Sequence, residues 1–214
     1  MEESATLVKF GLFEHLFQLR DQGLIYMNNL LHFWKIEDEE LRGDVNDSID
    51  ELMRGKKGKL KDNTNDITTI SNWQLRIQPL DADKINIFSL YALRPHKGTF
   101  PIPQKNNKFG THALVFTEPQ VFIEKISTLF RENSIDARAG LVTYVDDNYA
   151  GKIGPFIKLR KFGYQSEWRI VCYNGPGIAR KFFIGSLKDI SIILPSQELN
   201  DKIKIDNSGN IILS

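Results

Sequence analysis

The stretch Tyr164-Gln165-Ser166-Glu167-Trp168-Arg169-Ile170-Val171-Cys172 has the composition of a β-strand, because aromatic and β-branched residues alternate with polar ones. Successive side chains of a strand point to opposite faces, so one face, with Trp168 and Ile170, is expected to pack on a core. The other face carries an amide, a carboxylate and a guanidinium, from Gln165, Glu167 and Arg169. Because burying such groups without partners is costly, we expect this strand to line a cleft.

Composition places the chain among globular proteins. It has 214 residues, of which 41% are hydrophobic, and a formal net charge of +1. A single cysteine, Cys172, excludes an internal disulfide framework and a Cys-based zinc site. No apolar run reaches the roughly 20 residues of a membrane span, and Met1–Ser4 has no signal-peptide layout. We therefore expect a cytoplasmic protein with no membrane partner.

The chain opens with a strand, a helix, a glycine and a second strand. Residues 5–10 favour a strand, and residues 12–21 favour a helix with leucines at helical spacing. Gly23 stands where a C-cap glycine belongs, and residues 24–31 favour the second strand. A second helix is expected from Pro119 to Glu132, since proline is tolerated in the first turn.

Strands dominate the rest of the chain and do not alternate regularly with helices. This favours an α+β fold with a mixed or antiparallel sheet and two or three helices, in a single domain covering residues 1–214. Glycines and lysines at about 55–66 predict an exposed, mobile basic loop. Its lysines, which form either a solvated hairpin tip or a contact to nucleic-acid phosphates, are Lys56, Lys57, Lys59 and Lys61.

Several catalytic signatures are absent from the sequence. It has no phosphate-binding P-loop, no Gly-rich dinucleotide fingerprint and no nucleophile elbow. The four histidines show no metal-ligand spacing, so no metal site is expected. What remains is the Gln165-x-Glu167 pair together with the N-terminal strand, helix, glycine and strand.

This combination resembles the ADP-ribosyltransferase superfamily. In that family a basic residue on the first strand, a Tyr or Ser on the second strand and a glutamate on a later strand form the site. The resemblance implies a split β-sandwich and an NAD-dependent mono-ADP-ribosyltransferase. It also implies a bacterial toxin, with an antitoxin partner, or a phage-defence effector that modifies nucleic acid or protein.

The chain is also similar to an uncharacterised bacterial domain family along nearly its whole length. The shared segments are a G-x-IYM-N strand, an acidic RGD segment, an F-x-L strand and a closing Q-x-EWRI strand, found here at residues 23–28, 42–44, 88–90 and 165–170.

The resemblance to the transferases assigns roles to individual residues. Glu167 would stabilise the oxocarbenium-like state of NAD cleavage, and Gln165 would contact the acceptor. The NAD-binding residues would be Lys9 on the first strand, Tyr26 and Asn28 on the second strand, and Arg42 in the acidic segment. If these roles hold, Glu167, Tyr26 and Lys9 converge in one cleft.

Other interpretations of the same residues stay open. Glu167 and Arg169 can form ordinary ion pairs on a strand face. Tyr26 can be a simple sheet aromatic, and Lys9 an exposed strand lysine. A binding module that uses the cleft for a nucleotide or a partner is the alternative function, and a nuclease-like hydrolase is weakened by the lack of metal-ligand clusters.

Overall fold

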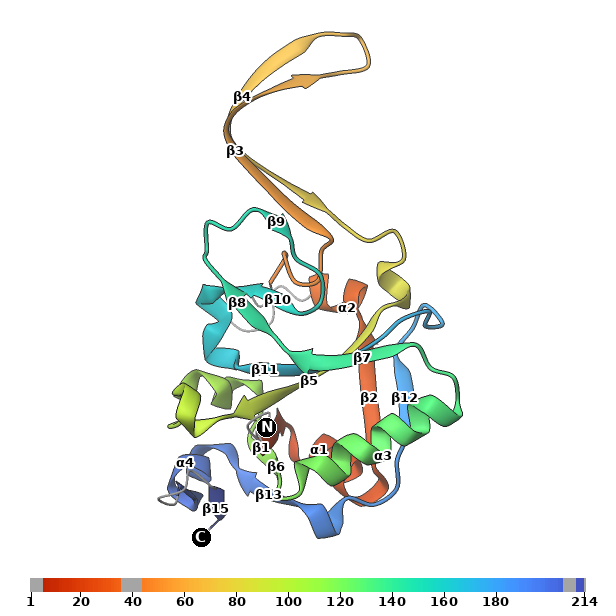
Figure 1. Ribbon diagram of the computed structural model, residues 1–214, viewed down its shortest axis with the longest axis vertical. Helices are drawn as coiled ribbons and strands as arrows, with labels where there is room; N and C mark the ends of the chain where they lie inside the picture. Colours follow the sequence, from red (N-terminus) through yellow and green to blue (C-terminus); the bar gives the residue numbers. More distant parts are fainter. Residues whose placement is uncertain (1–5, 36–43, 206–210, 214) are drawn as a thin grey trace.

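The fold is built around the long central strand β5 of an antiparallel sheet (Figure 1). The computed structural model describes residues 6–35, 44–205 and 211–213. Within them the main sheet has eight strands, in the order β12-β2-β5-β1-β6-β13, with β11 and then β7 added at β5. These strands are β1 (Thr6–Gly11), β2 (Leu24–Asn29), β5 (Asn86–Leu93), β6 (His112–Phe116), β7 (Ala137–Leu141), β11 (Glu167–Cys172), β12 (Arg180–Phe183) and β13 (Ser191–Pro195).

Two edges of β5 are used differently. Strand β11 pairs with β5 from Asn86 to Tyr91 along one edge. The other edge is shared, because β1 pairs with residues 91–93 and β2 with residues 86–87. Strands β1 and β2 therefore part from each other beside the middle of β5.

One face of the sheet is covered by the two long helices, α1 (Phe13–Gln22) and α3 (Pro119–Glu132) (Figure 1). Leu16 of α1 and Phe122 of α3 pack in one cluster with Phe88, Ile170 and Cys172 of the sheet. Helix α1 ends at Gly23, which has φ 66 as a left-handed C-cap. The short helices are α2 (Leu30–Trp34), α4 (Leu199–Lys202) and the 3-10 turns η1 (Ala82–Lys84), η2 (Pro95–Lys97), η3 (Gln104–Phe109), η4 (Arg160–Gln165), η5 (Lys188–Ile190) and η6 (Ser196–Glu198).

Smaller sheets lie around the main one. Strands β8 (Thr143–Val145) and β10 (Ile157–Leu159) form a parallel pair, and β14 (Ile203–Ile205) pairs with β15 (Ile211–Leu213). Strands β3 (Glu51–Lys61) and β4 (Ile67–Ile77) form a long antiparallel hairpin, and β9 (Gly151–Lys152) joins only its base. We call residues 51–77 the arm; it projects far from the body of the molecule (Figure 1), and 11 residues of strand span about 36 Å.

The expected α+β class, single domain, antiparallel sheet and two main helices are confirmed. Two local expectations are wrong. The predicted loop at 55–66 is strand β3 as far as Lys61, because its backbone pairs with β4. Residues 164–166 lie in η4 and its cap, where Ser166 adopts φ 38, so the closing strand begins at Glu167. The split β-sandwich of the transferases stays a prediction.

Candidate functional site

The polar face of β11 is buried against the segment that precedes the arm. Trp168 and Ile170 pack under the helices, so Glu167 and Arg169 point to the opposite side of the sheet. Only 7% of Glu167 and 2% of Arg169 are exposed. The expected cleft strand is thus a core strand whose polar side chains must find partners inside the protein.

Arg169 binds two carboxylates at once. Its Nε donates to Glu167 Oε2 at 2.7 Å, and its two terminal nitrogens donate to the two carboxylate oxygens of Asp47 at 2.7 Å each. A further bond, of 2.9 Å, goes to the carbonyl oxygen of Pro155. This is the bidentate geometry that makes arginine–carboxylate pairs strong and specific.

Lys158 of β10 completes the cluster. Its Nζ donates to Gln165 Oε1 at 2.6 Å and to Glu167 Oε1 at 2.8 Å, and it lies 3.3 Å from Asp47 Oδ2. Two acids and two bases therefore meet in the interior with balanced charge. We call Asp47, Lys158, Gln165, Glu167 and Arg169 the ion cluster.

Electrostatics in the ion cluster favours the charged forms. Burial alone would raise the pKa of Glu167 and of Asp47, but Arg169 and Lys158 hold the pKa of both carboxyl groups well below their usual range. Burial alone would lower the pKa of Lys158, but the two carboxylates raise it. All four groups are therefore ionised at neutral pH.

Asp44 lies beside the ion cluster and behaves differently. It is 4% exposed, its Oδ1 accepts a bond from the Asn46 amide, and its Oδ2 has no hydrogen-bond partner among the described residues. Burial and the nearby charge of Asp47 raise the pKa of this carboxyl.

The chemistry of Glu167 is limited by these contacts. Both of its carboxylate oxygens accept bonds from cations, and its backbone amide donates to the Tyr144 hydroxyl at 2.9 Å. A carboxylate that stabilises a developing cation needs a negative charge that is not already neutralised. Gln165, expected on the same strand, does approach Glu167, but from η4 and through the shared ammonium of Lys158.

The residues expected to hold NAD do not form one cleft with Glu167. Val8, Tyr91 and Glu167 are neighbours across three strands and share a face, so Lys9 lies on the opposite face. There its Nζ is 4.4 Å from the centre of the Phe88 ring and donates to the Ser89 carbonyl.

Tyr26 and Asn28 lie on the same face of the sheet as Glu167 but away from it. Asn28 pairs with Ile87, which neighbours Val171, and Glu167 is four residues, about 13 Å, further along β11. Tyr26 is 46% exposed, and the Nζ of its cross-strand partner Lys181 lies 5.8 Å from the centre of its ring. Arg42 lies outside the described residues.

The lysines expected to contact nucleic acid all lie on β3 of the arm. Lys56, Lys57, Lys59 and Lys61 are exposed. The arm also exposes large apolar side chains, with 58% of Leu60, 61% of Ile67 and 52% of Leu75 accessible. The lysines thus all lie on β3, whereas the exposed apolar residues come from both strands of the arm.

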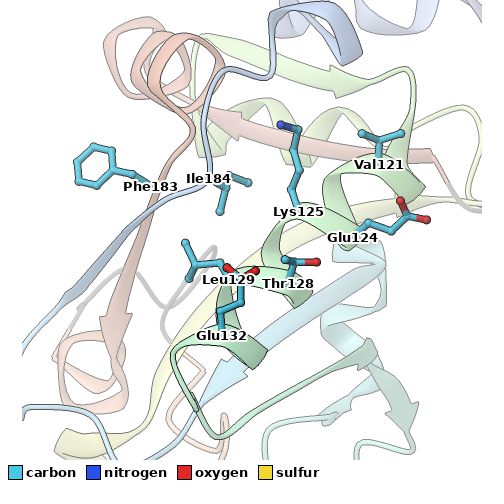
Figure 2. Close-up of a pocket in the computed structure, with 8 residues that line it drawn as sticks. All are labelled: Val121, Glu124, Lys125, Thr128, Leu129, Glu132, Phe183 and Ile184. Atoms are coloured by element: carbon cyan, nitrogen blue, oxygen red, sulfur yellow. The ribbon is translucent and has the colours of Figure 1, made fainter.

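A shallow groove of about 410 Å³ lies between α3 and the end of β12 (Figure 2). Figure 2 shows apolar and charged side chains around it, among them Leu129, Phe183, Glu124, Lys125 and Glu132. It is separate from the ion cluster, which lies on the other face of the sheet.

Two members of the ion cluster, Asp47 and Lys158, were missed by the sequence analysis. A lysine between Ile157 and Leu159 in a short apolar strand is the one local signal, because an inward lysine requires acidic partners. Asp47 gives no comparable signal, since it lies 122 residues from Arg169 in the sequence.

Searches with this chain against protein-family models, curated proteins and solved structures each found no match. No helix in the described part of the chain combines the length and the apolar character needed to cross a membrane. Among the same residues, no group of three or more His, Cys, Asp or Glu side chains is placed to hold a metal ion.

Proposed function

We propose that this protein binds nucleic acid through the arm. The observation that carries the proposal is the separation of charge from the body. Residues 51–77 contain six basic and three acidic side chains, a net charge of +3, whereas the remaining 22 basic and 24 acidic side chains give a net charge of −2. The small net charge of +1 is thus the sum of a basic arm and a slightly acidic body.

The architecture of the arm supports a role in binding. A two-stranded hairpin is marginally stable by itself in water, and among the residues that the structure describes only Glu51 and Leu52 gain a third strand, from β9. Beyond that point no third strand pairs with the hairpin in the described part of the chain, and several of its apolar side chains are exposed. A surface of this kind is stabilised by a partner, and its lysines select a partner with negative charge.

The spacing of the lysines suits a polyanion. Lys57, Lys59 and Lys61 alternate along β3, so they share one face and recur about every 6.7 Å. Lysine contacts to phosphates release counterions and supply affinity that does not depend on base sequence. A two-stranded ribbon is also narrow enough to enter a nucleic-acid groove.

Fluorescence anisotropy with labelled oligonucleotides, over a range of salt concentrations, tests the proposal. The variant changes the four arm lysines, Lys56, Lys57, Lys59 and Lys61, to glutamine. The matched control changes four exposed lysines elsewhere, Lys84, Lys181, Lys188 and Lys204, to glutamine. Both variants lose the same net charge.

We expect the arm variant to bind at least about tenfold more weakly at 0.1 M salt and to lose about 3 from the slope of log K against log salt. The control variant is expected to keep most of the affinity and most of the salt slope. Equal losses in the two variants would show only non-specific charge attraction, and an unchanged arm variant would refute the proposal.

A second candidate is NAD-dependent ADP-ribosylation, as the family resemblance implies, with an antitoxin or other regulator as its partner. The observation that favours it is the approach of Gln165 to Glu167 at Lys158. Incubation with labelled NAD and RNA, DNA or lysate protein tests it, with Glu167→Gln compared against Glu124→Gln. Absence of both label transfer and nicotinamide release would rule this candidate out.

A further inference from the structure

The indole of Trp73 on β4 lies directly against the backbone of β3. A Cβ added to Gly55 would be 2.6 Å from the ring atoms Cε2 and Nε1, and one added to Gly58 would be 2.7 Å from Nε1. Any side chain at either position would displace the ring. The two glycines of the basic segment are thus the surface on which the tryptophan rests.

The ring crosses an irregular point of the arm. The ladder pairs Gly55 with Trp73 and Lys57 with Ser71 but skips Lys56 and Asn72, and Asn72 adopts φ 51. Trp73 is half-buried, and its Nε1 donor is covered and has no hydrogen-bond partner among the described residues. A covered N–H donor without a hydrogen-bond partner destabilises a protein. The packing of the ring against the glycine backbone, and not its N–H group, therefore keeps Trp73 in this position.

This placement is not that of a core tryptophan. Trp168 packs on the main cluster, and Trp34 donates its ring N–H to the Asp47 carbonyl. Trp73 instead lies on a ribbon of two strands, with one side against glycine backbone. Part of the Trp73 side chain remains accessible to solvent, and an aromatic ring supported in this way can stack with another flat ring.

We propose that Trp73 is a stacking platform for an unpaired base of single-stranded nucleic acid, with Lys56, Lys57 and Lys59 on the flanking phosphates. This inference rests on the proposed function and names its substrate class. Base–aromatic stacking combined with a basic surface is the usual way in which proteins bind single strands, and it tolerates any base sequence. The aliphatic part of a lysine side chain is long enough to place the ammonium group at the edge of the hairpin.

A single strand is favoured over a duplex because of the stacking itself. Both faces of a base inside a duplex are already covered by its neighbours, so such a base cannot also stack on a protein ring. A duplex would use the arm lysines and leave the indole unchanged. The two substrates therefore make different demands on Trp73.

The experiment compares wild type, Trp73→Ala, Trp73→Phe and Leu75→Ala on a labelled oligo-dT and on a DNA duplex. Leu75 is the matched control, because it is exposed, apolar and two residues away on β4. Anisotropy gives affinity and its salt slope. Tryptophan fluorescence, recorded while unlabelled oligo-dT is added, reports stacking directly.

We expect Trp73→Ala to weaken oligo-dT binding by about five- to a hundredfold with an unchanged salt slope. Trp73→Phe should keep most of the affinity, and Leu75→Ala nearly all of it. Oligo-dT should quench the fluorescence of wild type, and this quenching should be absent from Trp73→Phe. Duplex binding should change less than twofold.

Three outcomes contradict the inference in different ways. If Trp73→Ala binds oligo-dT as wild type does, the platform is wrong while nucleic-acid binding by the arm stands. If oligo-dT and duplex binding fall equally, Trp73 only maintains the shape of the arm. If wild type binds neither probe, the platform and the proposed function both fail.

Discussion

Replacing Arg169 by methionine tests how strongly the ion cluster holds the protein together. Methionine keeps an unbranched apolar stem in a site where 2% of the arginine is exposed, but it removes the guanidinium that binds two carboxylates at 2.7 Å. Asp47 and Glu167 would then face Lys158 alone, with excess negative charge in the interior. Breaking a buried pair from one side costs about 3–5 kcal/mol.

Urea unfolding at pH 7, followed by far-UV circular dichroism, measures this loss. A domain of ordinary stability has about 5–15 kcal/mol, so the Arg169→Met variant should fold and unfold at a lower midpoint. The control is Arg138→Met on the neighbouring strand β7, where the side chain is exposed and the expected change is within about 0.5 kcal/mol.

A double variant separates lost charge balance from lost packing. Arg169→Met with Glu167→Leu leaves Asp47 and Lys158 as a neutral pair, and a neutral interior should recover at least about 1 kcal/mol relative to Arg169→Met. A single variant within about 1 kcal/mol of wild type would refute the reasoning. The reasoning would also be refuted if the double variant lost as much free energy of unfolding as Arg169→Met and Glu167→Leu lose together.

Three further measurements follow from the structure. Because the charge partners hold the pKa of Glu167 and Asp47 below their usual values, their stabilisation is present above about pH 4 and is lost as the pH falls towards the lower folded-state pKa. The urea midpoint should therefore fall between pH 5 and pH 3, and should fall less in the methionine variant. Burial raises the pKa of the Cys172 thiol to about 12, so a thiol reagent should label it only as fast as the protein opens, and rapid labelling of the native protein would contradict this. Gly23→Ala should destabilise more than Gly98→Ala, since both have φ near 70 but only Gly23 lies against a facing backbone carbonyl; equal unfolding midpoints would exclude that contact.

Local patterns predicted the elements whose cause is local. Helix α3 begins at Pro119 and buries Phe122, Ile126 and Phe130, as proline in the first turn and helical apolar spacing require. Helix α1 ends at Gly23, because a left-handed residue is easiest for glycine. In both cases the residues that determine the structure are close together in the chain.

Elements whose cause is distant were misjudged. Residues 55–61 have little strand propensity of their own, and they form β3 because β4 offers β-branched partners such as Ile67 and Ile70 across the hairpin. Ser166 turns the chain before β11, and its hydroxyl and carbonyl both bond to Ala92, 74 residues away. Alternating polarity alone could not distinguish this turn from another pair of strand residues.

The ion cluster and the arm are connected through the short segment that contains Asp47. Asp47 precedes β3 by four residues, and next to it Ile49 and Leu52 pack with Ile153 in a small cluster of their own. Strand β9 adds pairing only at Glu51 and Leu52. The base of the arm is therefore held to the body by these contacts, by the bond from Arg54 to the Asp147 carbonyl oxygen, and by the ion pairs that Arg169 and Lys158 form with Asp47.

A buried charge cluster is a weak source of net stability, because the loss of hydration offsets most of the attraction between the charges. Its stronger effect is on geometry, since bidentate bonds permit one arrangement of guanidinium and carboxylate. An apolar contact in the same place would allow the segment before the arm to slide. The polar face of β11, which the sequence marks as a site for chemistry, thus binds the short segment from which the arm begins.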